Sequence, residues 1–108
     1  MSLTDKQWRF LQDVAYLIFY AKSIGMKLTG GELYRTEYQQ EKYVKDGLSK
    51  TMNSKHRSKL AIDLFLIIDN RIGTKEEYKP LGDYWKQLRP ENEWGGDWGW
   101  DANHFQTS

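Results

Sequence analysis

The longest apolar stretch of the chain, residues 60–68, is the feature that most constrains its fold. Within it, Asp63 is the one charged residue, and the pair Asp69-Asn70 follows it as a turn signal. Nine residues rich in β-branched side chains are typical of a strand rather than a helix, and they fall far short of the roughly 20 apolar residues that cross a bilayer. We therefore predict a central strand that is buried on both faces, and no membrane span.

Helical spacing of apolar residues, together with helix-end signals, predicts three helices. The first covers residues 5–24, begins with a capping box of Thr4 and Gln7, and ends before a glycine. The second covers residues 37–46 and follows a similar capping box. The third covers residues 78–89, with one proline in its first turn and another immediately after its end.

Shorter strands are predicted at residues 27–29, 32–35 and 103–106. Helices and strands thus mix without the regular strand–helix–strand alternation of a parallel sheet, which predicts an α+β fold. The 108 residues are enough for one modest core, so we expect residues 1–108 to form a single domain.

The composition excludes several kinds of chemistry and partner. The chain has no cysteine, so a metal would have to be bound by His, Asp or Glu, and thiol nucleophiles are absent. Its net charge of +1 gives no overall attraction to nucleic acid. Its first residues lack the basic and apolar segments of a secretory signal, so we expect synthesis in a cytoplasm.

Asp63 interrupts the apolar run, and a carboxylate there cannot be buried alone without costing several kcal/mol. It therefore pairs with a basic residue, lies at a strand bulge, or binds a metal. The two histidines of the chain, His56 and His104, are ordinary loop and strand side chains or two further metal ligands. Two imidazoles and one carboxylate are a common ligand set for catalytic Zn²⁺, with the fourth position left for water.

Other residues near these three also have a structural and a functional interpretation. Asp101 is a turn residue or helix cap, or a base that takes a proton from a metal-activated water. Arg35 pairs with an acid such as Asp63, or it polarises a substrate carbonyl or holds a substrate carboxylate. The tail tryptophans fill a small core, which we favour, or line a groove for sugar or peptide. They are Trp94, Trp98 and Trp100.

The segment 54–63 resembles the Ser-x-His-x6-Asp motif of a zinc peptidase family. That family contains the D-alanyl-D-alanine carboxypeptidases and dipeptidases and the L-alanyl-D-glutamate endopeptidases of phage lysis enzymes. Residues 94–98 and 101–105 are similar to the closing motif of the family, and residues 32–36 and 47–51 are similar to two further stretches in the same order. The resemblance covers about three quarters of the chain.

This resemblance implies a small antiparallel sheet flanked by helices, and one Zn²⁺ per chain. The chain departs from the family at Lys59, where many members have a small residue, often glycine. The site residues that the resemblance implies are the metal ligands His56, Asp63 and His104, the catalytic residues Asp101 and Arg35, and the substrate-binding residue Ser54. We expect Trp98 to bind substrate as well, if the tail tryptophans line a groove.

The resemblance implies an endolysin-type zinc peptidase that hydrolyses a stem-peptide bond of bacterial peptidoglycan. We expect L-alanyl-D-glutamate as the bond, zinc-activated water as the nucleophile and an Asp as the base. The alternatives are a D-alanyl-D-alanine dipeptidase or carboxypeptidase, a non-catalytic cell-wall-binding module on the same fold and, weakest, a single-stranded nucleic-acid binder. We expect a monomer without a separate cell-wall-binding domain or a nucleic-acid partner. It would be made in the host bacterial cytoplasm and act on the wall after release by another factor.

Overall fold

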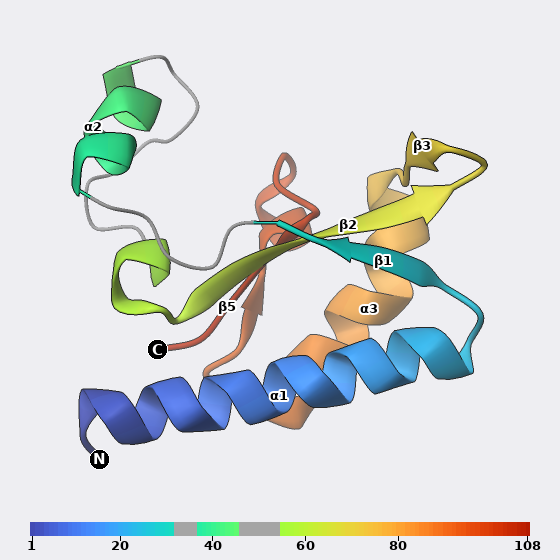
Figure 1. Ribbon diagram of the computed structural model, residues 1–108. Helices are drawn as coiled ribbons and strands as arrows, with labels where there is room; N and C mark the ends of the chain where they lie inside the picture. Colours follow the sequence, from blue (N-terminus) through green and yellow to red (C-terminus); the bar gives the residue numbers. More distant parts are fainter. Residues whose placement is uncertain (32–36, 46–54) are drawn as a thin grey trace.

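The computed structural model describes residues 1–31, 37–45 and 55–108. Over these ranges the chain forms three α-helices and a five-stranded antiparallel sheet, which confirms the predicted α+β fold (Figure 1). The helices are α1 (Leu3–Ser23), α2 (Glu37–Lys45) and α3 (Lys75–Leu88). The strands are β1 (Lys27–Gly30), β2 (Ala61–Ile68), β3 (Arg71–Ile72), β4 (Glu93–Trp94) and β5 (His104–Gln106). Two 3-10 turns, η1 (Lys55–Ser58) and η2 (Gly95–Trp98), precede β2 and follow β4.

Strand β2 is central in the sheet, as predicted. The sheet order is β1-β2-β5-β4, and β3 forms a hairpin with β2. The first residues of β2 pair with β5, and its later residues pair with β1 and β3. The hairpin turn at Asp69 and Asn70 has φ angles of 50° and 62°, and two positive φ values are the geometry preferred by two-residue hairpins.

The two faces of β2 differ, which corrects the prediction that both are buried. Leu64 and Leu66 are buried in the core with residues of α1 and α3. The intervening residues Asp63, Phe65 and Ile67 alternate onto the other face and are only partly buried. Asp63 therefore lies in the apolar run without entering the core.

Helix α1 begins two residues earlier than predicted, and the capping box predicted for Thr4 and Gln7 is wrong. Ser2 is the N-cap: its hydroxyl accepts the Asp5 N–H at 3.1 Å, and the Asp5 carboxylate accepts the Ser2 N–H at 3.3 Å. The Gln7 amide instead donates to a backbone carbonyl of η1 at 2.9 Å. The helix ends before Gly25, whose φ of 76° suits the predicted glycine stop.

Helix α3 begins three residues earlier than predicted. Thr74 is its N-cap, and Thr74 and Glu77 exchange side-chain-to-backbone hydrogen bonds in a capping box. Pro80 therefore lies inside the helix and not in its first turn, which corrects the prediction. Arg89 is extended with φ at −154°, as the residue before Pro90 tends to be, and it ends the helix.

The remaining predicted elements agree with the structure where it describes them. Strands β1 and β5 and helix α2 lie within a residue of their predicted bounds over the described ranges. The strand predicted at residues 32–35 lies outside the described residues. Among the described helices, none has the length and apolar character that would let it cross a membrane.

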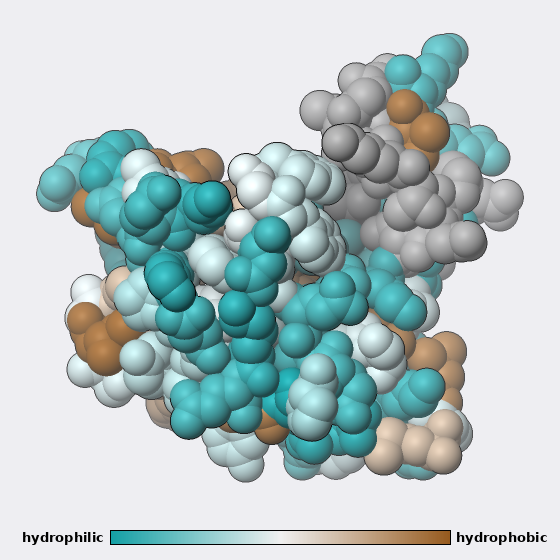
Figure 2. Space-filling view, turned by 180° about the vertical axis from the view of Figure 1, so that it is seen from behind, coloured by the Kyte–Doolittle hydropathy of each residue, from teal (hydrophilic) through white to brown (hydrophobic). Residues whose placement is uncertain are grey.

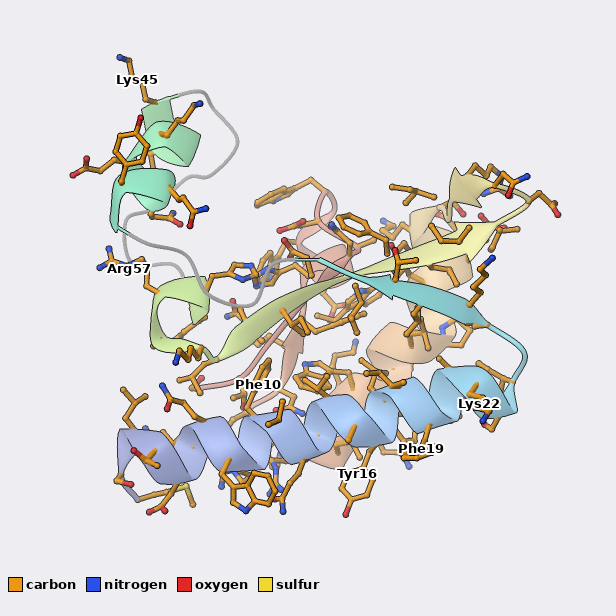
Figure 3. All side chains as sticks on the ribbon, viewed as in Figure 1. Phe10, Tyr16, Phe19, Lys22, Lys45 and Arg57 are labelled. Carbon is orange, nitrogen blue, oxygen red and sulfur yellow. The ribbon has the colours of Figure 1, made fainter. Side chains whose placement is uncertain are left out.

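The hydrophobic core lies between the sheet and helices α1 and α3. Phe10 points from α1 towards the sheet, and its ring meets the buried Trp85 of α3 edge-on at 5.6 Å (Figure 3). Tyr16 points away from the core on the same helix. The surface seen from behind is largely hydrophilic (Figure 2), in agreement with the exposed charged side chains of α3. These include Lys75, Glu76, Lys79 and Asp83.

The tail tryptophans divide between core and surface. Trp94 is buried in the core, as favoured above, but Trp98 and Trp100 are 39% and 56% exposed. The prediction that all three fill the core is therefore wrong for the last two. The chain turns outward after η2, where Gly99 adopts a φ of 91°.

Candidate metal centre

Two histidines and an aspartate from separate segments converge on the face of β2 away from the core. Asp63 on β2 and His104 on β5 are direct partners in the antiparallel register, and His56 lies on η1, which leads into β2. Oδ1 of Asp63 lies 3.4 Å from Nε2 of His56 and 3.4 Å from Nδ1 of His104. The structure thus brings the three predicted ligands together, with one donor atom from each within 4.8 Å of the others.

A tight turn between η1 and β2 places His56 beside the strand. The N–H of Leu60 donates to the Lys55 carbonyl at 2.9 Å, and Lys59 between them has a φ of 58°. This left-handed conformation suits glycine. The resemblance leads one to expect a small residue here, often glycine, and in this chain Lys59 adopts the left-handed conformation. His56 is fully buried.

Asp63 is an ionised carboxylate between two imidazoles. Burial raises the pKa of its carboxyl, but hydrogen bonds and charge interactions with His104 and His56 outweigh burial and lower the pKa from 3.8 to about 2. Burial also lowers the pKa of His104. Hydrogen bonds with Asp63 and Gln106 and the charges of Asp63 and Asp101 more than compensate, so the His104 pKa is raised above 6.5. The cluster therefore favours positive charge beside Asp63, supplied by a proton or by a metal ion.

The spacing of the donor atoms fits a tetrahedral metal ion. Zinc–ligand bonds of about 2.0–2.1 Å place neighbouring donors of a tetrahedron about 3.3–3.4 Å apart. Both contacts of Asp63 Oδ1 measure 3.4 Å. Two imidazole nitrogens and a carboxylate oxygen are also donors that Zn²⁺ accepts in sites with a fourth, open position. The residues present therefore fit zinc in chemistry, and the two separations to Asp63 Oδ1 have the tetrahedral length, with all three donors within 4.8 Å of one another.

Asp101 lies beside the cluster, with its Oδ2 at 3.9 Å from Nδ1 of His104. Its carbonyl accepts the His104 N–H at 3.0 Å, and its backbone packs so closely on Gly95 that a side chain at Gly95 would collide with it. The Asp101 side chain is 25% exposed. This carboxylate therefore borders both the cluster and solvent, as a group that exchanges protons with water requires.

Trp98 forms an aromatic wall next to the cluster. Its ring centroid lies 5.2 Å from that of His104 and 6.1 Å from that of Trp100. Both tryptophans are partly exposed, so their apolar faces are available beside the candidate metal centre. Such rings suit contacts with the flat or apolar parts of a substrate.

Two of the predicted site residues, Arg35 and Ser54, lie outside the described residues. Conversely, the prediction missed Gln106, whose Oε1 lies 2.8 Å from Nε2 of His104. The signal that could have found it is the strand period, because Gln106 is two residues after His104 and therefore on the same face of β5.

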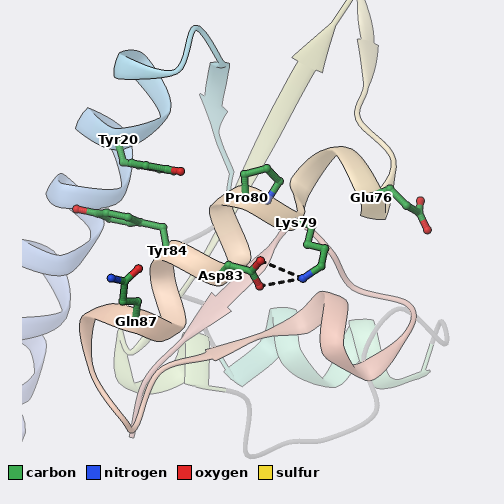
Figure 4. A pocket seen from close by; sticks show the side chains of 7 residues that line it. All are labelled: Tyr20, Glu76, Lys79, Pro80, Asp83, Tyr84 and Gln87. Carbon is green, nitrogen blue, oxygen red and sulfur yellow. Dashed lines mark hydrogen bonds and ion pairs between the residues drawn. The ribbon is translucent and has the colours of Figure 1, made fainter.

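A groove of about 660 Å³ lies apart from this cluster, between α1 and α3 (Figure 4). There Lys79 is paired with both carboxylate oxygens of Asp83, and Tyr20 stacks on Tyr84 at 4.1 Å. Among the described residues, the group of three that could share a metal is His56, Asp63 and His104, which lies outside this groove.

A comparison with models of known protein families identifies the family of this chain. A peptidase M15 family model described as D-alanyl-D-alanine carboxypeptidase matches residues 47–107, which is more than half of the chain. The chain belongs to this family. The family resemblance of the sequence motifs is thereby confirmed, whereas the phage endolysin branch stays a prediction.

Solved structures share the fold of this family member. One is the Serratia marcescens L-Ala D-Glu endopeptidase ChiX, with a TM-score of 0.75 and 21% identity, over 93% of this chain and 78% of that one. Another is a Zn(II) complex of a mutant of the vancomycin resistance D,D-pentapeptidase VanY, with a TM-score of 0.65 and 16% identity, over 92% of this chain and 70% of that one. At these identities the likeness shows the fold alone. No curated protein matched the sequence.

Proposed function

We propose that this protein is a zinc-dependent peptidase that cuts stem peptides of bacterial peptidoglycan. The observation that carries the proposal is the cluster of His56, Asp63 and His104, in which both distances to Asp63 Oδ1 fit tetrahedral zinc, with the carboxylate of Asp101 beside it. Membership of the D-alanyl-D-alanine carboxypeptidase family supports a peptidase, and a solved structure of the same fold, VanY, is a Zn(II) complex.

His56, Asp63 and His104 would hold the ion. A bound Zn²⁺ polarises a peptide carbonyl and makes water acidic enough to give up a proton near neutral pH. Asp101 takes that proton from the attacking water and passes it to the leaving amine, a role that its position between cluster and solvent allows. Arg35 assists by stabilising the charge that develops on the carbonyl oxygen.

Substrate binding uses the surface around this centre. Trp98 offers an exposed ring next to His104, and Trp100 extends the same aromatic surface. Ser54, two residues before His56, would hydrogen-bond near the metal or the substrate. A stem peptide lying along this wall would be oriented with its scissile carbonyl towards the centre.

Within this function we propose L-alanyl-D-glutamate as the bond cut, and a phage endolysin-type role. The motif pair of the sequence resembles the lysin branch, and one solved structure that shares the fold is an L-Ala D-Glu endopeptidase. In that role the protein is made in the host cytoplasm and reaches the wall after release. The second candidate is a D-alanyl-D-alanine carboxypeptidase, which the description of the family model favours.

Mass spectrometry of purified peptidoglycan digested by this protein tests the proposal. We expect new peptide ends at D-glutamate, which disappear when a chelator is added and return with Zn²⁺. Release of terminal D-alanine would replace the endopeptidase by the carboxypeptidase. An absence of cleavage with Zn²⁺ present would contradict a peptidase and would favour a binding module on the same fold.

A further inference from the structure

The Gln106 side chain contacts the His104 ring at Nε2, whereas the other ring nitrogen, Nδ1, faces Asp63. Its Oε1 lies 2.8 Å from Nε2 of His104. An amide oxygen only accepts hydrogen bonds, so Nε2 must be the donor. When Nε2 carries the single proton of the neutral imidazole, Nδ1 keeps a lone pair. Nδ1 is the nitrogen that faces Asp63 Oδ1 at 3.4 Å, so this tautomer presents a metal-binding lone pair to the cluster.

The backbone of Gln106 is fixed from both sides. In the sheet, Gln106 is the register partner of Ala61 on β2 and of Glu93 on β4. Its carbonyl also accepts a hydrogen bond at 3.0 Å from Nε1 of Trp85, which is buried in the core. The side chain is itself partly buried. The side-chain amide of Gln106 therefore extends to His104 from a main chain that has little freedom to move.

The His104 ring is held in two directions. Gln106 bonds its edge through Nε2, and the Trp98 ring packs near it at 5.2 Å between centroids. Trp98 can restrict the ring plane, but it carries no acceptor that distinguishes one ring nitrogen from the other. Asp63 Oδ1, at 3.4 Å, is the acceptor next to Nδ1 in the metal-free protein, and Gln106 is the contact that holds the proton on Nε2 when a metal ion takes the place of the proton on Nδ1.

We infer that Gln106 is a positioning residue for metal binding: it orients His104 and holds its proton on Nε2, so that Nδ1 is free for the ion. The inference rests on the proposed zinc function and deepens it. Residues that accept the second N–H of a ligand histidine support metal affinity by about 10–100-fold. A neutral amide does so without adding charge, whereas a carboxylate at the same place would make the imidazole a stronger donor.

The test compares the zinc affinity of purified variants by competition with a chromophoric chelator. Gln106→Met keeps the length of the side chain but removes the acceptor, and we expect it to bind Zn²⁺ roughly 10–100-fold more weakly. Gln106→Glu keeps the acceptor, and we expect affinity equal to or tighter than that of the unmodified protein. Gln87→Met, at the separate groove between α1 and α3, is the matched control and should bind zinc normally.

Two further readouts separate positioning from packing. The visible spectrum of the Co²⁺-substituted protein reports ligand geometry, and we expect it to change in Gln106→Met and to return in Gln106→Glu. Thermal unfolding of the metal-free variants shows whether each is folded. If Gln106→Met does not fold, Gln106→Glu still decides, because loss of affinity there would overturn the inference.

Different results would contradict the role of Gln106 and the proposed zinc function. If the unmodified protein binds zinc and Gln106→Met binds it equally well, Gln106 does not position His104 for the metal. Equal weakening in Gln106→Met and Gln106→Glu would assign Gln106 to packing alone. If the unmodified protein binds no zinc, the proposed function itself is wrong.

Discussion

Two carboxylates of this protein, Asp13 and Asp63, have little or partial exposure to solvent but very different partners. Their comparison separates a structural ion pair from a candidate metal site. Asp13 of α1 is 2% exposed, and its Oδ2 accepts hydrogen bonds from Nε of Arg89 at 2.7 Å and from Nδ2 of Asn92 at 3.4 Å. Asp63 faces the imidazoles of His56 and His104. One carboxylate has a guanidinium as its partner, and the other has nitrogen bases.

The chemical difference between a guanidinium partner and imidazole partners determines whether each carboxylate can help to bind a metal ion. A guanidinium is charged at every relevant pH and has no lone pair to offer a metal, so the pair of Asp13 and Arg89 ties α1 to the end of α3. An imidazole can be neutral, and the positive charge beside Asp63 can then come from an exchangeable ion. Substitution of the two aspartates by the same residue should therefore give opposite results.

The largest expected effect is on activity and metal binding in Asp63→Asn. The amide lacks the charge that holds the ion, so we expect zinc affinity to fall by at least about 100-fold and hydrolysis of peptidoglycan to fall to the level seen with excess chelator. Zinc competition and product analysis measure both quantities. Asp13→Asn is the matched control and should keep its zinc. If Asp13→Asn lost as much zinc as Asp63→Asn, the two carboxylates would not differ in metal binding, and our assignment of the metal site to Asp63 would be contradicted.

The next effect concerns the base beside the centre. In Asp101→Asn we expect the turnover number to fall by about 10²–10⁴-fold, since an amide cannot take the proton of the attacking water. Zinc content should stay at that of the unmodified protein, because Asp101 lies outside the three-donor cluster. Steady-state kinetics with zinc analysis of the same sample checks this. A variant that is inactive because it is metal-free would make Asp101 a ligand.

Much of the candidate site could be predicted because the chemistry is local in sequence. His56 and Asp63 are seven residues apart across one turn, and the carboxylate in an apolar run is anomalous by itself. The face on which Asp63 lies could not be predicted, because it depends on where α1 and α3 cover the sheet. The strand period places Gln106 on the same face as His104, but the pattern does not say which side-chain rotamers would bring its amide to the ring.

The fold was predictable in its elements and less so at their ends. Competing capping boxes of the same type lie two residues apart at the start of α1, and pattern alone does not choose between Ser2 and Thr4. Pro80 suits a first turn, but the box of Thr74 and Glu77 begins the helix earlier. The exposure of Trp98 was unpredictable because nothing in its local sequence distinguishes it from the buried Trp94.

The third effect is on stability, and it falls on the other aspartate. Asp13→Asn removes a charge-assisted hydrogen bond and leaves the Arg89 guanidinium partly buried, so we expect a loss of about 2 kcal/mol in the free energy of unfolding. For a domain of this size that lowers Tm by roughly 8 °C. Thermal unfolding with chelator present measures it, with Asp63→Asn in parallel. If Asp63→Asn lost more free energy of unfolding than Asp13→Asn, the cluster around Asp63 would have the larger structural role, contrary to our expectation.

The smallest effect is the pH dependence of stability in the metal-free protein. The pKa of Asp63 is lowered from 3.8 to about 2 in the folded state, so its contribution is present above pH 3.8 and is lost as the pH falls towards 2. The pKa of His104 is raised above 6.5, so its contribution is present below pH 6.5 and is lost as the pH rises through the folded value. Both contributions are therefore present together between pH 3.8 and 6.5.

The difference in Tm between the unmodified protein and Asp63→Asn isolates these two groups, because the rest of the titration is common to both. With chelator present, we expect this difference to be largest between pH 3.8 and 6.5 and to shrink by a few degrees, roughly 2–5 °C, on either side. The corresponding difference for Asp101→Asn should be smaller, since Asp101 contributes least to the raised pKa of His104. A difference that does not change with pH would mean that Asp63 and His104 do not form an ion pair without a metal. The cluster would then need a metal ion to offset the charge of its carboxylate, whereas Asp13 has the permanent charge of Arg89.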